Sequence, residues 1–357
     1  MSGPLHIRDA RPSDEPELRR LAEAEMPGTI RMAFAQSPDF FAAERIRGET
    51  RLGILTDDGS AVLGCGARVV RRAWFDGAWR RTGYYCTLRA TSSGRNARAL
   101  AKAYEWAREI ERADPLPVVT STIMAGNLRA RRLLTSRRFG LPAYLDAGAI
   151  VTYTATGEAL SRFGEASGGC GVVTGEDVGE TALREYYSSD AGRQPLFPEL
   201  PHPLPPGLRL GDFLVVVRRG RIAAAAALWD QSALRQVRIT GYDPWLGAVR
   251  PLANVALRAF GMPVLPRPGS DLRFRYLAFR RMSGDDEAVR ALFSGVGSAA
   301  GRRGLVSFSV HERDPLSGQL SRLRAVRVTS RLYTLSYDDD PQPVDFGGAP
   351  YVEAAML

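Results

Sequence analysis

Apolar and polar residues follow one another along this chain in two similar passes of strands and helices. In the first pass, apolar runs predict strands at residues 51–56, 61–70, 81–89 and 118–123, and a helical period predicts a helix at residues 98–107. In the second pass, the same signals predict strands at residues 212–218, 222–229, 272–279 and 305–310 and helices at residues 244–260 and 285–300. The order of elements repeats although the residues do not. We therefore expect a mixed α/β (α+β) fold of two tandem domains, each a mostly antiparallel sheet flanked by helices.

The length of 357 residues exceeds what one compact core usually takes, which also favours two domains. We expect them at residues 1–155 and 171–340, with a tail at 341–357. Residues 156–170 are rich in Gly, Ser and Glu and are predicted to be a linker. The proline-rich residues 195–206 are predicted to be a loop, because strand signals resume directly after them. The apolar side of this loop is expected to cover either the groove between the two copies or the second domain's own core.

The charge pattern and the cysteine content argue against several classes of function. The formal net charge is +9, yet the arginines are scattered along the chain and Lys102 is the only lysine, so nucleic-acid binding is disfavoured. The three cysteines and three histidines lack metal-ligand spacing, and neither a disulfide framework nor a metal site is predicted. We find no hydrophobic segment typical of a signal peptide or membrane span, and we expect a cytoplasmic protein without membrane insertion.

The most informative stretch is the strand at 81–89, the turn of small residues at 92–97 and the helix that follows. A strand that ends in such a turn and opens a helix presents free backbone N–H groups beside the positive end of the helix dipole. This arrangement suits a pyrophosphate. A strand at 118–123 and the pattern Asn127-x-x-Ala130-x-x-Leu133 come next. The order resembles the acyl-CoA site of the GNAT acyltransferase superfamily.

The resemblance implies a set of cofactor contacts. The phosphate loop of the superfamily is written Gln/Arg-x-x-Gly-x-Gly/Ala; the matching window here is 92–97, where Ala97 fits and Gly94 lies one place early. The backbone of the fourth strand would pair with the pantetheine arm, the turn would hold the pyrophosphate, and the helix after residue 127 would contact the pantetheine side. The cofactor-binding residues expected in this way are Leu88, Arg89, Ala90, Ser93, Gly94, Arg95, Asn96, Ala97, Arg98, Asn127 and Arg131. Asn127 is equally well explained as a helix N-cap.

The catalytic residues are less clearly marked. Many members of the superfamily carry a Tyr one residue after the Leu of the second motif, as the acid that protonates the leaving thiolate, and this chain has Leu134 there. Another hydroxyl then protonates the sulfur, or the thiolate leaves unaided, or the domain binds without catalysing. Base candidates are the tyrosines of the fourth strand and two carboxylates; Tyr85 and Tyr144 are preferred over Tyr84, Glu25 and Asp146.

The second copy is predicted to lack a cofactor. Asp285, Asp286 and Glu287 stand at its phosphate-loop position, where carboxylates suit a helix start and repel a pyrophosphate. The resemblance thus implies an acyl-CoA-dependent N-acyltransferase that uses acetyl-CoA or another acyl-CoA as co-substrate, without a metal. Its acceptor would be an amine of a small molecule or a peptide. Fatty-acyl transfer and a catalytically inactive acyl-CoA-binding protein are the alternatives.

Overall fold

The structure is a computed structural model that describes residues 4–26, 28–57, 61–92, 94–165, 171–190, 193–282 and 284–357. Ser93, one of the expected phosphate-loop residues, lies outside the described residues, as does Cys170. The strands are β1 (Leu5–Asp9), β2 (Ile30–Ala35), β3 (Glu49–Asp57), β4 (Ala61–Phe75), β5 (Ala78–Ala90), β6 (Val119–Met124), β7 (Ala143–Thr156), β8 (Gly171–Thr174), β9 (Phe213–Arg218), β10 (Arg221–Trp229), β11 (Gln236–Tyr242), β12 (Asp271–Leu272), β13 (Arg275–Met282), β14 (Leu305–His311) and β15 (Ala325–Ser336).

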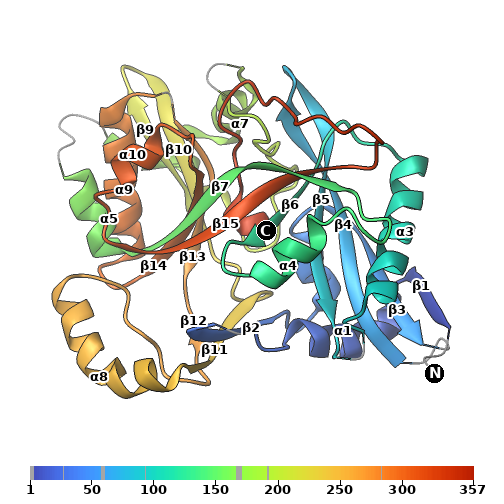
Figure 1. Ribbon diagram of the computed structural model, residues 1–357. Coiled ribbons are helices and arrows are strands. Elements are labelled where there is room, and N and C mark those ends of the chain that lie inside the picture. Colours follow the sequence, from blue (N-terminus) through green and yellow to red (C-terminus); the bar gives the residue numbers. More distant parts are fainter. Residues whose placement is uncertain are drawn as a thin grey trace.

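The helices flank these strands on both sides (Figure 1). They are α1 (Glu15–Ala22), α2 (Phe40–Arg45), α3 (Ala97–Ala113), α4 (Leu128–Leu134), α5 (Gly157–Gly164), α6 (Gly175–Val178), α7 (Glu180–Ser188), α8 (Pro244–Ala259), α9 (Asp286–Ala300) and α10 (Leu316–Leu320), with short 3-10 turns at Pro12–Asp14, Leu210–Asp212 and Ala354–Met356. The expected mixed α/β fold is confirmed.

One twelve-stranded sheet runs through the molecule in the order β1-β3-β4-β5-β6-β15-β7-β14-β13-β10-β9-β8. Within the described residues, neighbouring strands of this sheet pair antiparallel except for β5 with β6 and β13 with β14. Counted inward from either edge, three antiparallel pairings are followed by one parallel pairing. The element order of the first half, up to residue 165, is thus repeated by the second half, from residue 171.

The two halves exchange their last strands at the centre of the sheet. β15, from the end of the second half, lies between β6 and β7 of the first half, and β7 in turn pairs with β14 of the second. Figure 1 shows β7 in green and β15 in red crossing the middle of the molecule side by side. A smaller sheet of order β12-β11-β2 adds another connection, because β2 belongs to the first half and β11 to the second. Both halves therefore contribute to one continuous structure.

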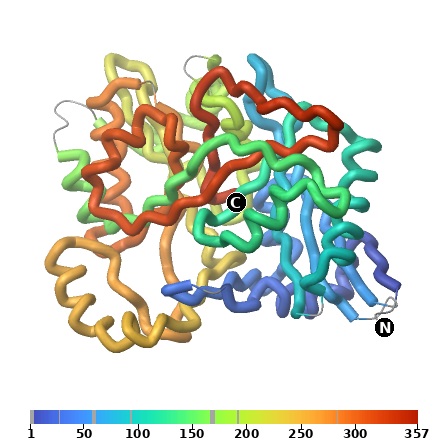
Figure 2. Tube along the Cα trace, viewed as in Figure 1, coloured from blue at the N-terminus to red at the C-terminus, as the bar shows by residue number. Residues whose placement is uncertain are grey.

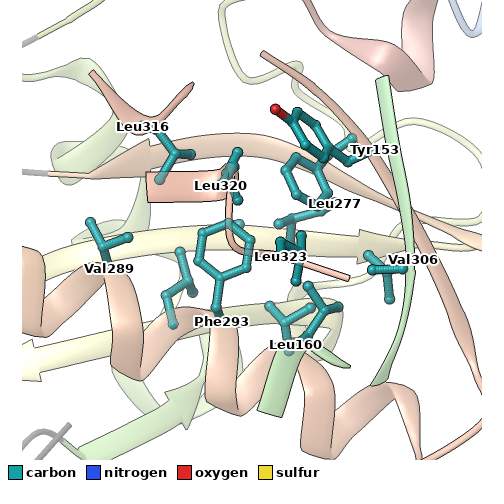
Figure 3. Close-up of a cluster of buried hydrophobic side chains, with 14 of the residues drawn as sticks. Tyr153, Leu160, Leu277, Val289, Phe293, Val306, Leu316, Leu320 and Leu323 are labelled. Atoms are coloured by element: carbon teal, nitrogen blue, oxygen red, sulfur yellow. The ribbon is translucent and has the colours of Figure 1, made fainter. Parts of the chain in front are cut away.

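The segment predicted to be a linker begins with a helix instead. α5 packs against α9, and the glycines of both helices make this approach close: a Cβ on Gly157 would overlap the carbonyl oxygen of Gly301, and one on Gly164 would overlap that of Arg290. Glycine here serves helix packing rather than chain flexibility. Figure 3 shows the buried cluster beside this contact, where Leu160 of α5 lies near Phe293 of α9.

The proline-rich loop connects the two halves through backbone hydrogen bonds. Leu196 N donates to Trp74 O at 2.7 Å, and Trp74 N donates to Phe197 O at 2.9 Å, so the loop extends the β4 edge of the first half. The side chain of Phe197 is buried in a core cluster with Tyr187, Phe213 and Trp229 of the second half. Leu196 of the same loop packs against Val118 of the first half. The loop thus lies against both halves and fastens the β4–β5 hairpin to the buried cluster of the second, so it does not separate the two expected positions.

Candidate functional site

Strands β5 and β6 pair over three residues only and then separate. Gly83, Tyr84 and Tyr85 are in parallel register with residues 119–121, and no described strand pairs with β5 on this side beyond Tyr85. Thr87 has a positive φ of 55°, and the β4–β5 register shifts at the same place. Such a bulge bends the strand away from its neighbour. We call this place the β5–β6 divergence; residues 88–90, expected to pair with a pantetheine arm, line it.

The N-terminus of α3 lies directly after this strand. The Asn96 side chain caps the helix by accepting a hydrogen bond from Ala99 N at 2.8 Å. Among the described residues, no acceptor is found for the backbone N–H groups of Ala97 and Arg98, and the side chains of Arg95 and Arg98 are exposed. Two free N–H groups at the positive end of a 17-residue helix, with two arginines beside them, are suited to an anion and make this helix start a candidate site.

Gly94 is explained by packing. A Cβ at this position would overlap the carbonyl oxygen of Leu63 in β4, and Gly94 N donates to Thr91 Oγ1 at 3.1 Å. The glycine allows the turn to lie against the sheet, so its N–H is not available to a ligand without a change in the turn. Arg95 is held in a similar way, since its Nε donates to Ala90 O at 3.2 Å.

Asn127 and Arg131 both make contacts within the protein. Asn127 is the N-cap of α4 and accepts from Ala130 N at 3.1 Å, as the simpler of the two interpretations expected. Arg131 donates to Ala125 O and to the hydroxyl of Tyr333, both at 3.3 Å. These bonds fix α4 beside β6 and β15.

Tyr85 and Tyr144 lie in a buried cluster beneath α3. The Tyr144 hydroxyl is hydrogen-bonded to that of Tyr104 at 2.5 Å, and the Tyr85 hydroxyl donates to Ala107 O at 3.4 Å. Burial raises the pKa of Tyr85 above its ordinary value, and it raises the pKa of Tyr144 well above it. Leu134 packs into the same cluster. These positions weigh against a base role for either tyrosine, because the hydroxyls are engaged and hold their protons.

The opposite face of β5 carries a cluster of polar side chains that the sequence alone does not predict. Tyr84 points to this face because successive strand residues alternate. Its hydroxyl is hydrogen-bonded to Thr122 Oγ1 of β6 at 2.7 Å, across the start of the divergence. The Arg71 guanidinium lies 5.6 Å from the centre of the Tyr84 ring, and its Nη1 is buried without a hydrogen-bond partner among the described residues. Burial raises the pKa of Tyr84 to about 12, so the hydroxyl stays neutral at physiological pH.

Glu44 of α2 completes this face. Its carboxylate accepts from Gln36 Nε2 at 2.5 Å and from Thr87 Oγ1 at 3.2 Å, and it forms an ion pair with Arg47. Although burial opposes ionisation, the charge and hydrogen bonds of Arg47 together with the bond from Gln36 hold the pKa of Glu44 below its usual value. Each oxygen is engaged, so Glu44 fixes α2 and the Thr87 bulge in place. Arg235 of the second half lies close enough to act on this carboxylate electrostatically.

The two remaining carboxylate candidates form contacts at the surface. Glu25 accepts from Thr240 Oγ1 at 2.6 Å and lies 3.8 Å from Arg31. Asp146 forms a two-bond ion pair with Arg331 at 2.5 and 2.9 Å. Among the described residues, no group of three His, Cys, Asp or Glu side chains is arranged to hold a metal ion. No described helix is long and apolar enough to cross a membrane.

The second half contains an equivalent divergence that its own chain fills. β13 and β14 pair only at Arg275 and Tyr276, and Phe279, three residues beyond this pairing, has a positive φ of 50°. In β5 the residue with positive φ, Thr87, lies two residues beyond the last pair. Here Glu353 occupies the edge: its carboxylate accepts from Phe279 N at 2.6 Å and from Tyr351 OH at 2.8 Å. The backbone edge that is open in β5 is therefore satisfied in β13.

The helix that follows β13 starts with the expected carboxylates. Asp285 is the N-cap of α9 and accepts from Glu287 N at 3.0 Å. Arg218 forms ion pairs with both Asp285 and Glu287. The N-terminus of α9 is thus capped and already carries negative charge.

No protein-family model and no curated protein sequence matches this chain. Solved structures share its fold. A GCN5-related N-acetyltransferase from Sphaerobacter thermophilus is 14% identical, with a TM-score of 0.55 and coverage of 100% of both chains. One from Anabaena variabilis is 11% identical, with a TM-score of 0.52, and the match covers 94% of this chain and 73% of that one.

A third similar structure belongs to a larger protein. It is the GCN5-related glucosamine N-acetyltransferase region of a fungal multi-domain GH3 β-N-acetylglucosaminidase, 10% identical with a TM-score of 0.60. The match covers 94% of this chain and 38% of that chain, so this chain spans well under half of that protein's length. At such identities the similarity concerns architecture. The chain has the fold of the GCN5-related N-acetyltransferases, the GNAT fold.

Proposed function

We propose that this protein is an acyl-CoA-dependent N-acyltransferase that binds its donor in the first half and transfers the acyl group directly to an amine. The observation that carries the proposal is the β5–β6 divergence beside the N-terminus of α3, where the N–H groups of Ala97 and Arg98 have no acceptor among the described residues. An unpaired backbone edge lies there next to a helix start that suits an anion. Acyl-CoA has an arm with amide groups, which could pair with the edge, and a pyrophosphate, which could bind at the helix start. The fold of the similar structures supports the same reaction class.

The donor would lie along β5 and end at α3. The edge of residues 88–90 would pair with the amides of the pantetheine arm, as a neighbouring strand would. The N–H groups of Ala97 and Arg98 would take the pyrophosphate, with the Arg98 guanidinium beside it. This differs from the expectation of a phosphate loop centred on Gly94, whose N–H is used by Thr91.

The chemistry would take place where Tyr84 crosses the start of the divergence. The amine nitrogen forms a bond to the thioester carbonyl carbon, the carbon–sulfur bond breaks, and the nitrogen loses a proton while the sulfur gains one. A neutral hydroxyl is suited to supply the proton to sulfur, and Tyr84, with its pKa raised to about 12 by burial, is such a group. Arg71 Nη1 offers an unused donor to a carbonyl or anionic group of the acceptor.

We further propose that the second half is a divergent GNAT-like copy without a cofactor. Two features support this: Glu353 occupies the edge of β13, and Asp285 and Glu287 place negative charge at the N-terminus of α9. The second half would instead complete the acceptor side, since Arg235 lies near Glu44 and β11 pairs with β2. One CoA per chain is the expected stoichiometry.

The test is calorimetric titration of the full chain with CoA, using wild type and two charge-reversal variants on the same helix. Arg98→Glu changes the first turn of α3, and Arg112→Glu, the matched control, changes its last turn. Arg98→Glu should weaken CoA binding by about 10- to 100-fold, because it places a carboxylate beside the pyrophosphate. Loss of helix stability cannot produce this difference in affinity. A carboxylate is favourable at a helix N-terminus and unfavourable at a C-terminus, so Arg112→Glu should destabilise α3 more than Arg98→Glu does. Wild-type protein that binds no CoA, or equal affinities for the two variants, would overturn the proposal.

A further inference from the structure

Helix α8 presents its apolar residues to solvent. Figure 1 shows α8 at the lower left of the molecule, and Figure 2 shows the same segment as part of a loop of chain that projects from the rest of the molecule. Asn254 is its only buried residue, whereas the exposed fractions are 63% for Trp245, 78% for Leu252, 64% for Val255 and 59% for Phe260 just after the helix. Large apolar side chains gathered at such exposure mark an interaction surface.

The inner side of α8 is the polar one. The Asn254 amide forms two hydrogen bonds to the backbone of Leu265, at 2.8 and 2.9 Å, and Arg250 donates to the carbonyl oxygens of Leu265 and Pro266. At 100° per residue, the exposed apolar side chains span an arc of about 140° opposite Asn254. The helix is therefore held by polar bonds on one side and is left without a partner on its apolar side.

The charge near this apolar arc is mainly positive. Residues 244–270 contain Arg250, Arg258 and Arg267 and no Asp or Glu, although Asp243 directly precedes the helix. The Glu158 carboxylate, which lies near Gly261, is paired with Arg162 and Arg302. Among the described residues, no carboxylate forms an ion pair with Arg258 or Arg267. An exposed Trp and aliphatic side chains on one side of a helix, with arginines on its other side, are typical of helices that lie in a membrane interface.

We propose that α8 docks this protein on the surface of an anionic lipid bilayer, with Trp245, Leu252, Val255 and Phe260 among the acyl chains and with Arg258 and Arg267 at the phosphate groups. Charge complementarity decides between this occupant and a second copy of the chain. In a two-fold contact between copies, Arg258 and Arg267 would approach their counterparts with few unpaired carboxylates nearby, which costs free energy. Anionic lipid neutralises the charge of each of them at the surface. The proposal is independent of the acyl transfer proposed above.

The experiment is flotation of the full chain with vesicles of phosphatidylcholine alone and of phosphatidylcholine with one quarter phosphatidylglycerol. Wild type should bind the anionic vesicles at least about tenfold more strongly than the neutral ones, and 0.5 M salt should reduce this binding. The double variant Leu252→Glu with Val255→Glu should lose at least about tenfold in binding. The matched control is Val326→Glu with Val328→Glu, which adds the same negative charge at two exposed valines of β15. Because these valines lie outside α8, this variant should lose binding only through its lower net charge, by about twofold.

A second readout covers a variant that folds poorly. Brominated acyl chains should quench the wild-type tryptophan fluorescence on vesicle binding, and Trp245→Phe should remove most of this quenching, because Trp245 is the most exposed tryptophan. Absence of wild-type binding to either vesicle, or equal loss in the two double variants, would overturn the proposal. Light scattering that shows a dimer broken by Leu252→Glu with Val255→Glu, together with no lipid binding, would assign the surface to a second copy instead.

Discussion

Replacing Glu353 by alanine is expected to lower the melting temperature of the protein by about 4–7 °C. The Glu353 carboxylate is buried and accepts three hydrogen bonds, from Phe279 N at 2.6 Å, Tyr351 OH at 2.8 Å and Ala355 N at 3.1 Å. Alanine leaves all three donors without this acceptor. The Tyr351 oxygen still accepts from Arg280 N at 2.9 Å, but its own O–H proton loses its partner.

The magnitude follows from these orphaned donors. Each buried donor without a partner costs about 1–3 kcal/mol. The three together cost about 3–5 kcal/mol, at the low end of their sum, because alanine also removes the cost of burying a carboxylate. An unfolding entropy of about 0.75 kcal/mol/K for a chain of 357 residues converts that loss into the expected shift. Glu353→Gln keeps one accepting oxygen and the volume of the side chain, and should lose only about 1–3 °C.

The assay is differential scanning calorimetry at neutral pH, with the exposed Glu105→Ala on α3 as a control for loss of a carboxylate. Glu105 is paired only with Lys102 at the surface, so its variant should melt within about 1 °C of wild type. The reasoning fails if Glu353→Ala melts with wild type, or if the Gln and Ala variants melt together. A second CoA bound by Glu353→Ala would further show that this side chain alone keeps the second half empty.

Two further predictions concern titration and proton transfer. Burial lowers the pKa of His311, whose Nε2 lies 2.8 Å from Ala147 O. As the pH falls through about 6.5, His311 is therefore protonated in the unfolded chain before it is protonated in the folded chain. The contribution of neutral His311 to stability is present above the ordinary pKa of 6.5 and is lost as the pH falls. Between pH 7.5 and 5.5 the melting temperature should therefore fall more for wild type than for His311→Gln. The control His202→Gln changes an exposed histidine and should behave as wild type. Tyr84→Phe should lower kcat at least about tenfold with the Kd for CoA unchanged, because it removes the hydroxyl at the divergence. Tyr104→Phe, which removes a buried hydroxyl on the other face, is the matched control, and an equal fall in kcat for both would contradict the assignment.

Local patterns predicted the elements around the candidate site, because those elements depend on neighbouring residues. The strand and helix expected at 81–89 and 98–107 correspond to β5 and α3, and Asn96 and Asn127 act as the helix caps that their side chains favour. The exchange of β7 and β15 could not be predicted in this way. Each pairs with a strand far away in the sequence, and no local signal specifies the partner.

The side chains at the site were harder to place than the elements. Whether a strand residue faces α3 or the acceptor side depends on the bulge at Thr87, where a single residue shifts the alternation. Glu44 looks like an ordinary surface residue of a short helix, and only the folded chain brings Gln36, Arg47 and Thr87 around it. The glycines of α5 favour a linker at the level of sequence, because a sequence does not show which helix they will contact.

The central position of β15 has a consequence for how the chain folds as it is made. The sheet of the first half lacks the strand between β6 and β7 until residues 325–336 have been synthesised, about two hundred residues after β6. Until then β6 and β7 expose unpaired edges, which are prone to wrong pairing with other chains. Closure of the sheet over so long a stretch of sequence makes folding slow and dependent on the whole chain. A ribosome-bound chain stalled before residue 325 should therefore be protease-sensitive throughout β6 and β7, long after both strands have left the exit tunnel.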